Sequence, residues 1–243
     1  SYGGLYAAKG AIDLEISTKE ARLSLASGYV ATGSGGAITV RADDMDFSSG
    51  SNKVFGKGQL SISTMTAEQG YRIGGAAQSP LGVDYSTEGK TGFLELGARD
   101  MSALADGFSS ITVGREGTTA LMRIGDLKDA KVASVLFSAK LNDVTSFVAD
   151  RIEIVGNVQS SEFLTFNARA LEVQRQNNND PAGAPESGIS APKMAVRATE
   201  QMLISGWMIA DQLIDIQVMG STGVGGFVTY GDEVNSLTAD KGA

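Results

Sequence analysis

A short pattern that recurs along the chain limits its fold more than any other feature of the sequence. The pattern has eight positions, in the order apolar, any, Ala, charged, any, apolar, acidic and apolar. Full copies occupy residues 40–47, 147–154 and 166–173. Ala149 and Ala168 hold the same place in two of them, 168 − 149 = 19 residues apart. A repeat of this length cannot bury its apolar residues alone, so each copy must stack on the next.

Looser copies extend the repeat over more of the chain. Residues 196–204 and 208–216 keep the Ala and the apolar alternation with one residue inserted, and residues 137–144 match in part. The centres of the expected strands are spaced by 17, 19, 23 and 20 residues in the series Val135, Ile152, Leu171, Met194 and Ile214. This period near twenty predicts a parallel β-solenoid whose coils lie about 4.8 Å apart.

The 19-residue step also predicts the register of two neighbouring coils, because a residue returns to the same place after one turn. The expected neighbours, all pointing inward, are Ala149 with Ala168, Ile152 with Leu171, and Ile154 with Val173. The same step should bring Asp150 close to Arg169.

Short runs in which apolar and polar residues alternate predict strands of three to five residues. The runs lie at residues 12–16, 38–40, 60–62, 93–96, 111–113, 152–154, 171–173 and 227–230. The chain has 31 Gly against 4 Pro, which favours tight turns between such strands. We therefore expect an all-β chain that forms one solenoid array over residues 1–243, as a mature product or as a fragment of a longer chain.

Two segments interrupt the period and are expected to leave the coil as loops. They lie at about residues 64–92, which include Pro80, and about residues 175–192, which are polar and contain three Pro. One short helix is expected near residues 100–107, with Asp100 as its N-cap and Gly107 near its end. Its apolar face would be formed by Met101, Leu104, Ala105 and Phe108.

The composition excludes several classes of function. The chain has no His and no Cys, which removes Ser-His-Asp and Cys-His catalysis, zinc fingers, iron–sulfur clusters and disulfides. Its formal net charge of −8 makes nucleic acid an unexpected partner. No apolar run is long enough to span a membrane as a helix, and the sequence from Ser1 shows no signal peptide.

Part of the chain resembles a known family in wording and order. Residues 58–66 and 71–75, followed by residues 96–115, resemble a segment found in giant bacterial exoproteins of filamentous-haemagglutinin type. The resemblance extends over roughly residues 35–175. It implies a secreted or surface-bound right-handed parallel β-helix that acts as an adhesin stalk, a matrix component or a contact surface.

Two glycine-rich segments could be mistaken for phosphate-binding loops. Residues 220–226 lack the Lys-Ser/Thr of a P-loop, and the run that follows them is typical of a strand where a dinucleotide-binding fold needs a helix. We interpret this segment, and the cluster at residues 33–36, as turns between coils.

Three acidic residues occupy the same position of the repeat and should point outward. They are Asp46, Glu153 and Glu172. Like charges on adjoining coils repel each other, and a calcium ion bound by several carboxylates would relieve this repulsion. The alternative, which we favour, is a solvated charged face that is relieved by Arg151 and Arg169.

Other candidate chemistry is less specific. Asp43 with Asp46, or Asp126 with Asp129, could supply the acid and the base of a glycosidase, although 28 acidic residues make such pairs common by chance. We interpret Trp207 as a buried filler or a plug at an edge rather than as a platform for sugars. No catalytic, cofactor-binding or metal-binding residue is assigned, and no cofactor is expected.

The function expected from these observations is a structural, adhesive or assembly module of an exported bacterial surface protein. It would be extracellular or on the cell surface, and it would act through the solenoid face. Its partners would be proteins or neighbouring copies in a larger assembly, or surface glycans. The alternative is a carbohydrate-active β-helix enzyme of the polysaccharide lyase or hydrolase type, which would use carboxylates.

Overall fold

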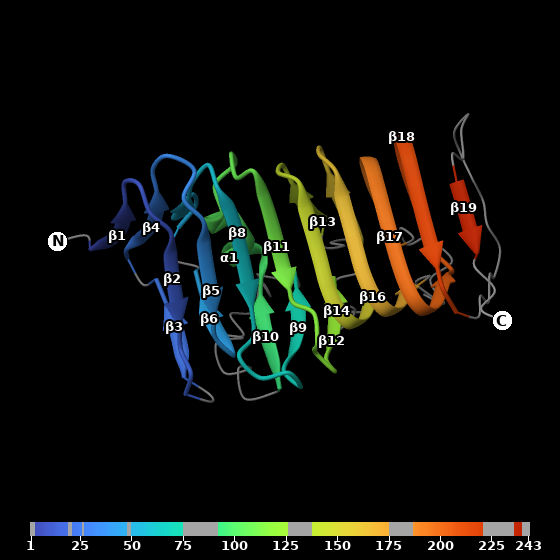
Figure 1. Ribbon diagram of the computed structural model, residues 1–243, viewed down its shortest axis with the longest axis horizontal. Coiled ribbons are helices and arrows are strands. Elements are labelled where there is room, and N and C mark those ends of the chain that lie inside the picture. The colour runs from blue at the N-terminus through green and yellow to red at the C-terminus, as the bar shows by residue number, and fades with distance from the viewer. Residues whose placement is uncertain are drawn as a thin grey trace, which may run out of the picture.

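The structure is a computed structural model, and it is nearly all β. It describes residues 3–18, 21–25, 27–47, 50–74, 92–125, 138–174, 187–220 and 236–239. The strands form one 14-stranded, one three-stranded and one two-stranded sheet, and in them neighbouring strands run parallel. Figure 1 shows an elongated molecule in which the strands follow one another from the N-terminal to the C-terminal end.

The strand pairs form three lines along the molecule. The first line has two parts, which no strand pair joins among the described residues, and in both parts the strands precede those of the second line in the chain. One part is β1 (Gly4–Ala7), β4 (Tyr29–Thr32) and β7 (Val54–Phe55), and the other is β13 (Ser138–Leu141), β15 (Asn157–Ser160) and the first parts of β17 (Gly188–Ile204) and β18 (Trp207–Val218).

The second line is continuous along the described residues. It consists of β2 (Ile12–Glu15), β5 (Ile38–Arg41), β8 (Gln59–Ser63), β11 (Ser110–Gly114), the first halves of β14 (Thr145–Ile154) and β16 (Leu164–Val173), later parts of β17 and β18, and β19 (Ser236–Ala239).

The third line starts with β3 (Arg22–Ser24) and β6 (Asp44–Asp46), against which β10 (Phe93–Leu96) lies. It continues through β9 (Gly70–Ile73), β12 (Leu121–Ile124) and the second halves of β14, β16 and β17. The order is not that of the sequence, because β10 lies between β6 and β9.

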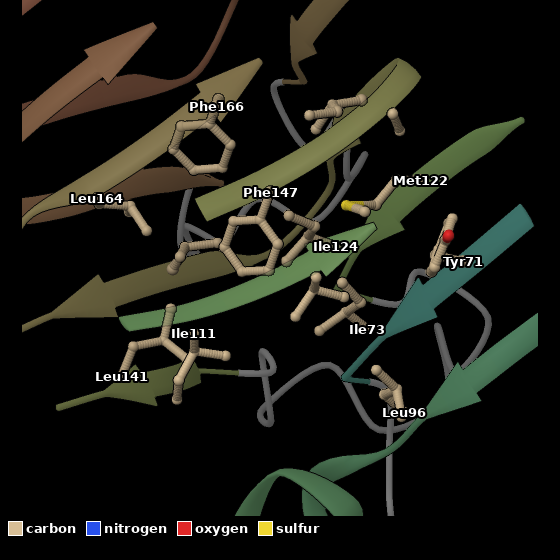
Figure 2. Packing of buried hydrophobic residues seen from close by; sticks show 14 of the residues in the cluster. Tyr71, Ile73, Leu96, Ile111, Met122, Ile124, Leu141, Phe147, Leu164 and Phe166 are labelled. Atoms are coloured by element: carbon tan, nitrogen blue, oxygen red, sulfur yellow. The ribbon is translucent and has the colours of Figure 1, made fainter. Parts of the chain in front are cut away.

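The core is built from side chains that stack along these lines. One inward row of the second line is apolar in eight successive strands: Leu14, Val40, Ile62, Val113, Phe147, Phe166, Val196 and Ile216. Phe147 and Phe166 are fully buried, and Figure 2 shows them beside the aliphatic side chains that complete this part of the core. Parallel strands in register place like residues above one another, so one apolar position in each repeat suffices to form a continuous core.

The predicted register between neighbouring repeats is confirmed. The strand pair β14–β16 places Ala149 beside Ala168, Ile152 beside Leu171, and Ile154 beside Val173. The predicted neighbours Asp150 and Arg169 form an ion pair, with Arg169 Nε 2.8 Å from Asp150 Oδ1. Each predicted alternating run within the described residues falls on a strand, and the run at 227–230 lies outside them.

The looser copies were interpreted correctly in one case and wrongly in another. Residues 196–204 do stack on 166–173, and the inserted residue forms a β-bulge, since Ala168 pairs with Ala198 but Ala170 pairs with Gln201. Residues 208–216, however, do not align with this copy, because Ala210 pairs with Ala191.

The predicted spacing of 23 residues between Leu171 and Met194 compared residues that lie on two different lines. Leu171 pairs with Met202, and Met194 pairs with Leu164. The reason is that β17 is 17 residues long and takes part in all three lines, so its apolar residues recur at more than one place in the repeat. Val135 and residue 137 lie outside the described residues.

Both predicted loops were too long, because each included residues that belong to a strand. Strand β9 lies within the predicted loop 64–92, and β17 begins at Gly188, inside the predicted loop 175–192. Residues 75–91 and 175–186 lie outside the described part of the chain. The missed strand β9 has the sequence Gly-Tyr-Arg-Ile, with buried Tyr71 and Ile73 on either side of Arg72, so its alternation was present but short.

The predicted helix exists, but its start is wrong. Helix α1 spans Ala98–Ala103 and its N-cap is Gly97, so Asp100 is the third residue of the helix rather than its cap. The Asp100 carboxylate accepts a hydrogen bond from the Gly97 N–H at 2.9 Å, which forms half of a capping box. Residues 104–107 continue the chain without helical structure.

Candidate functional site

A row of charged side chains on the third line is the most ordered polar feature of the described surface. We call Glu95, Arg72, Arg123, Glu153 and Glu172 the charged row, because each lies in direct register with the next, on β10, β9, β12, β14 and β16. They alternate along their strands with core residues such as Ile73, Ile124 and Ile152. The period-two alternation of a strand therefore turns all five side chains to the outer side.

Arginine joins the carboxylates of the charged row. Arg72 Nη1 lies 3.0 Å from Glu95 Oε1, and Arg123 Nη2 lies 2.8 Å from Glu153 Oε2. Arg151 Nη2 lies 3.0 Å from Glu153 Oε1 and 3.1 Å from Glu172 Oε2. Glu153 therefore has a guanidinium on each of its two oxygens, and its side chain is only 7% exposed.

The favoured interpretation of the outward acidic residues, a solvated charged face relieved by Arg151 and Arg169, is correct only in part, because the Glu153 side chain is buried. Glu153 and Glu172 adjoin as predicted, and the repulsion between them is offset by Arg151. Asp46 does not join them, because β6 pairs with β3 and three strands of the third line lie between β6 and β14. Arg169 was expected to relieve the same carboxylates, but it binds elsewhere.

Arg169 instead bridges two carboxylates at the β-bulge. Its guanidinium lies 2.8 Å from Asp150 Oδ1 and 2.6 Å from Glu200 Oε2, and Glu200 is one of the two residues of β17 that lie opposite Arg169 at the bulge. The hydrogen bond from Arg169 lowers the pKa of Asp150, and the two carboxylates raise the pKa of Arg169. The inserted residue thus extends the charged surface without interrupting the core.

Two buried carboxylates serve as acceptors for the backbone. Asp43 Oδ1 accepts hydrogen bonds from the N–H groups of Met65 (2.9 Å) and Thr66 (3.0 Å). Asp143 accepts from the N–H groups of Gly107 (3.0 Å) and Phe108 (3.2 Å). Asp43 thus holds the segment that follows β8, and Asp143 holds the segment that precedes β11, so that each buried carboxylate has hydrogen-bond partners.

The structure gives no support to the two carboxylate pairs that were considered for glycoside hydrolysis. Asp43, of the pair Asp43 and Asp46, is engaged by the turn at residues 65–66. Asp126 and Asp129 lie outside the described residues. Over the residues that the structure describes, no group of three or more Asp, Glu, His or Cys side chains is placed to hold a metal ion.

Asp100 differs from the other buried carboxylates. It accepts hydrogen bonds from the Phe47 N–H at 2.7 Å and the Gly97 N–H at 2.9 Å, and so ties helix α1 to the end of the first repeat. Burial raises its pKa to about 6, and the charge of Asp46 acts in the same direction, while the two N–H donors oppose both. Asp100 therefore connects helix α1 to residue 47 through a carboxyl group whose pKa is about 6.

Glycine and aromatic residues pair across three strand junctions. Tyr29 lies over Gly4, Phe93 over Gly70, and Trp207 over Gly188, each in direct register. A Cβ atom at any of these glycines would overlap the ring. Trp207 fills the space above Gly188, as predicted for a filler. Its side chain is half-buried rather than fully buried.

The glycine cluster at residues 33–36 forms a turn between β4 and β5, as predicted. Gly36 and Gly58 hold the same place before their strands, and a Cβ at Gly58 would collide with the Gly36 carbonyl. Only glycine permits the chain to stack so closely at this corner. Of residues 220–226, only Gly220 is described, and it lies in a bend after β18.

Sequence reasoning missed Arg72, Arg123 and Glu95, which complete the charged row. Each alternates with apolar residues in a short strand, and this alternation was the available signal. It also missed a row of hydroxyl side chains on the outer side of the second line. Five successive strands place there, in direct register and half-buried, Thr39, Ser61, Thr112, Ser146 and Thr165.

Comparison of the chain with protein-family models, with curated proteins and with solved structures finds no match. Within the described residues, no helix is long and apolar enough to cross a membrane.

Proposed function

We propose that the three lines of strands close into a right-handed parallel β-solenoid, and that this solenoid is a structural, adhesive or assembly module of an exported bacterial surface protein. Most strands that follow one another in the chain fall on successive lines, as when a chain winds around an axis. Strands β9 and β10 are the exception, because both lie on the third line. Connections between parallel strands of one sheet are right-handed in nearly all proteins, which supports the proposed hand.

The observation that carries the proposal is the apolar row that continues without a polar member from Leu14 to Ile216. A continuous core of this kind makes a stiff rod, because each repeat is held by both neighbours. The outer charges support the same function. The carboxylates of Glu153, Glu172 and Asp150 are neutralised by arginine on the surface rather than gathered in a cleft.

Export and surface location rest on the resemblance of residues 35–175 to exoproteins of filamentous-haemagglutinin type. The outer face of the second line, with its row of hydroxyl groups, supports contact with a protein or a glycan. The buried carboxylates Asp43 and Asp143 act as backbone acceptors, which supports a structural role over the enzymatic alternative.

The proposal is tested by labelling intact cells of the encoding bacterium with antibodies raised against the purified chain. We expect the antibodies to bind intact cells, and brief protease treatment of those cells to remove the signal. An antibody against a cytoplasmic protein, which should bind only after permeabilisation, is the control. Labelling that requires permeabilisation would contradict the surface location. Turnover of an acidic polysaccharide, abolished by replacing one carboxylate in a protein that still folds, would contradict the non-enzymatic function.

A further inference from the structure

Two aromatic side chains lie exposed on the outer side of the first line, in the part that Figure 1 shows close to the N-terminus. Tyr29 on β4 is 38% exposed, and Phe55 on β7 is 39% exposed. Their rings stack, with centroids 5.8 Å apart. Exposed apolar groups that cluster in this way mark surfaces of interaction.

The exposure of these two rings does not arise from an end of the stack of strands. Strand β4 pairs with β1 on one side and with β7 on the other, and β7 lies beside a further segment through the bridge between Val54 and Leu104. Val30 and Val54, which alternate with the aromatic residues, are each 1% exposed in the core. Tyr29 and Phe55 therefore point away from the core, on strands that have a neighbour on both sides.

The aromatic side chains form a closed apolar surface over β4. Ala31 is in direct register with Tyr6 on β1 and with Phe55 on β7, and it faces the same outer side. Ala31 is nevertheless 0% exposed, because the larger side chains beside it cover it. We call Tyr6, Tyr29 and Phe55 the aromatic face.

The surroundings of the aromatic face are basic. The segments that contain β1, β4 and β7 (residues 3–11, 27–37 and 50–58) carry no acidic residue and three lysines, Lys9, Lys53 and Lys57. The whole chain, by contrast, has 28 acidic against 20 basic residues. Lys53 lies beside Tyr29 in the stack, because the next residues of the two strands, Val54 and Val30, pair in parallel register.

The three lysines are available to an external anion. Among the residues that the structure describes, none of the three forms an ion pair, whereas the arginines of the charged row and Arg169 are each bound to carboxylates. Asp106 lies beyond β7, in the segment that follows Leu104, and its carboxylate accepts a hydrogen bond from Asn142 at 3.0 Å. An anionic ligand over β1, β4 and β7 would therefore meet lysine rather than carboxylate.

We propose that the aromatic face and its lysines bind an acidic polysaccharide. Sugar rings pack their C–H groups against aromatic rings, whose faces carry partial negative charge, and the anionic groups of the polymer would bind the ammonium groups. This inference rests on the proposed adhesive function and names the class of ligand.

The size of the face favours a polymer of sugars over a protein partner. A stable protein partner covers roughly 800 Å² of each surface, and two rings that are less than two fifths exposed offer only a small part of this area. A polysaccharide does not need a large contact at each sugar, because a polymer that binds many copies on a cell gains affinity from repeated weak contacts.

The experiment measures binding of the purified chain to three immobilised polymers by surface plasmon resonance. Polygalacturonate carries carboxylates, dextran sulfate carries sulfates, and dextran is the uncharged form of the second polymer. We expect the chain to bind at least one acidic polymer about tenfold or more tightly than dextran. Phe55→Ala should weaken this binding about tenfold, because it removes a ring on which a sugar packs. Lys53→Gln should weaken it several-fold and reduce its dependence on salt, because it removes one cation.

Phe163→Ala and Lys193→Gln are the matched controls. Phe163 is 37% exposed but follows Glu162, and Lys193 is exposed on β17, away from β4. Neither substitution should change the binding. If Phe55→Ala does not fold by circular dichroism, Lys53→Gln tests the same face without removing an apolar group.

The proposal is wrong if the chain binds none of the polymers, or binds dextran as tightly as the acidic ones. It is also wrong if the two controls weaken binding as much as Phe55→Ala and Lys53→Gln do, or if neither of these two weakens it. Self-association in sedimentation that Phe55→Ala abolishes would show that a second copy covers the rings instead. A chain that binds no polymer but still labels on intact cells would contradict this ligand and not the surface function.

Discussion

Phe147 on β14 and Phe166 on β16 lie in direct register, and their rings stack with centroids 5.5 Å apart. Both side chains are 0% exposed. Stacked aromatic pairs contribute about 0.5–1.5 kcal/mol beyond the burial of their surface. This pair stabilises the junction at which the repeat of 19 residues is most regular.

We expect Phe166→Ala to lower the free energy of unfolding by about 3–5 kcal/mol, because it opens a cavity in a continuous core. Urea unfolding followed by circular dichroism measures the change. Thr165→Ala is the matched control, because Thr165 precedes Phe166 on the same strand and faces outward, and its effect should stay within about 0.5 kcal/mol. Equal effects of the two variants would show that Phe166 is not in the core.

Glu153 should contribute more to stability than its neighbour Glu172. Two arginines bind the Glu153 carboxylate, whose side chain is 7% exposed, while Arg151 alone binds that of Glu172, which is 26% exposed. We expect Glu153→Gln to lower the free energy of unfolding by about 1–2 kcal/mol, and Glu172→Gln to lower it by less. Denaturant titrations of both variants at low and high salt provide the test. The opposite ranking would mean that the charged row does not hold Glu153 as described.

Calcium should have no effect on the stability of this surface. Arg151 already binds both carboxylates that a calcium ion would share, Glu153 and Glu172. We expect the midpoint of thermal unfolding to be the same in excess calcium and in excess chelator. The measurement is repeated with Arg151→Ala, which frees Glu172 and leaves Glu153 bound to Arg123 alone. A stabilisation by calcium that is already present in the natural chain would contradict this prediction.

The repeat allowed the register of β14 and β16 to be predicted, because the step from Ala149 to Ala168 contains no insertion into the repeat and the two strands are neighbours. The same reasoning failed for Met194. A spacing in sequence identifies a position in the coil only while the strands keep their length, and β17 runs through three lines.

The order of the third line could not be predicted from the sequence. Strand β10 follows β9 in the chain but lies before it in the stack, next to β6. The charged row depends on this order, because Glu95 and Arg123 flank Arg72 only through pairs between distant segments. The helix start was also missed, since Asp100 resembles an N-cap in sequence while its carboxylate caps Gly97 from within the helix.

Trp207 and Gly188 should show a strong energetic coupling. A Cβ at Gly188 would overlap the indole ring of Trp207. We expect Gly188→Ala to destabilise the natural chain by about 1–3 kcal/mol, because it crowds a packed junction. In a chain that already carries Trp207→Ala the ring is absent, so the same substitution should cost much less.

A double-mutant cycle of the two substitutions, measured by urea unfolding, gives the coupling directly. Gly117→Ala is not a suitable control, because Gly117 has a positive φ of 73°. Gly10→Ala is suitable, because a Cβ at Gly10 meets no atom within 4 Å. Additive effects of Gly188→Ala and Trp207→Ala would contradict the described contact.

Asp100 should make the stability of the chain depend on pH between about 4 and 6. Its pKa is about 6 in the folded chain against an ordinary value of 3.8, because burial disfavours its charged form. A raised pKa means that the folded state binds the proton more tightly than the unfolded state. The stabilisation is therefore complete below about pH 4 and is lost as the pH rises through 6. The shift corresponds to at most about 3 kcal/mol.

The comparison with Asp100→Asn isolates this contribution, because all other acidic groups are common to both proteins. Asparagine keeps one carbonyl oxygen as an acceptor for Phe47 N–H or Gly97 N–H but has no charge to bury. We expect the free energy of unfolding of the natural chain, relative to that of the variant, to fall between pH 4 and pH 7. Urea titrations at the two pH values measure this difference. A difference that stays constant, or that grows with pH, would mean that Asp100 is ionised at no cost in the folded chain, and that its hydrogen bonds to the two N–H groups outweigh its burial.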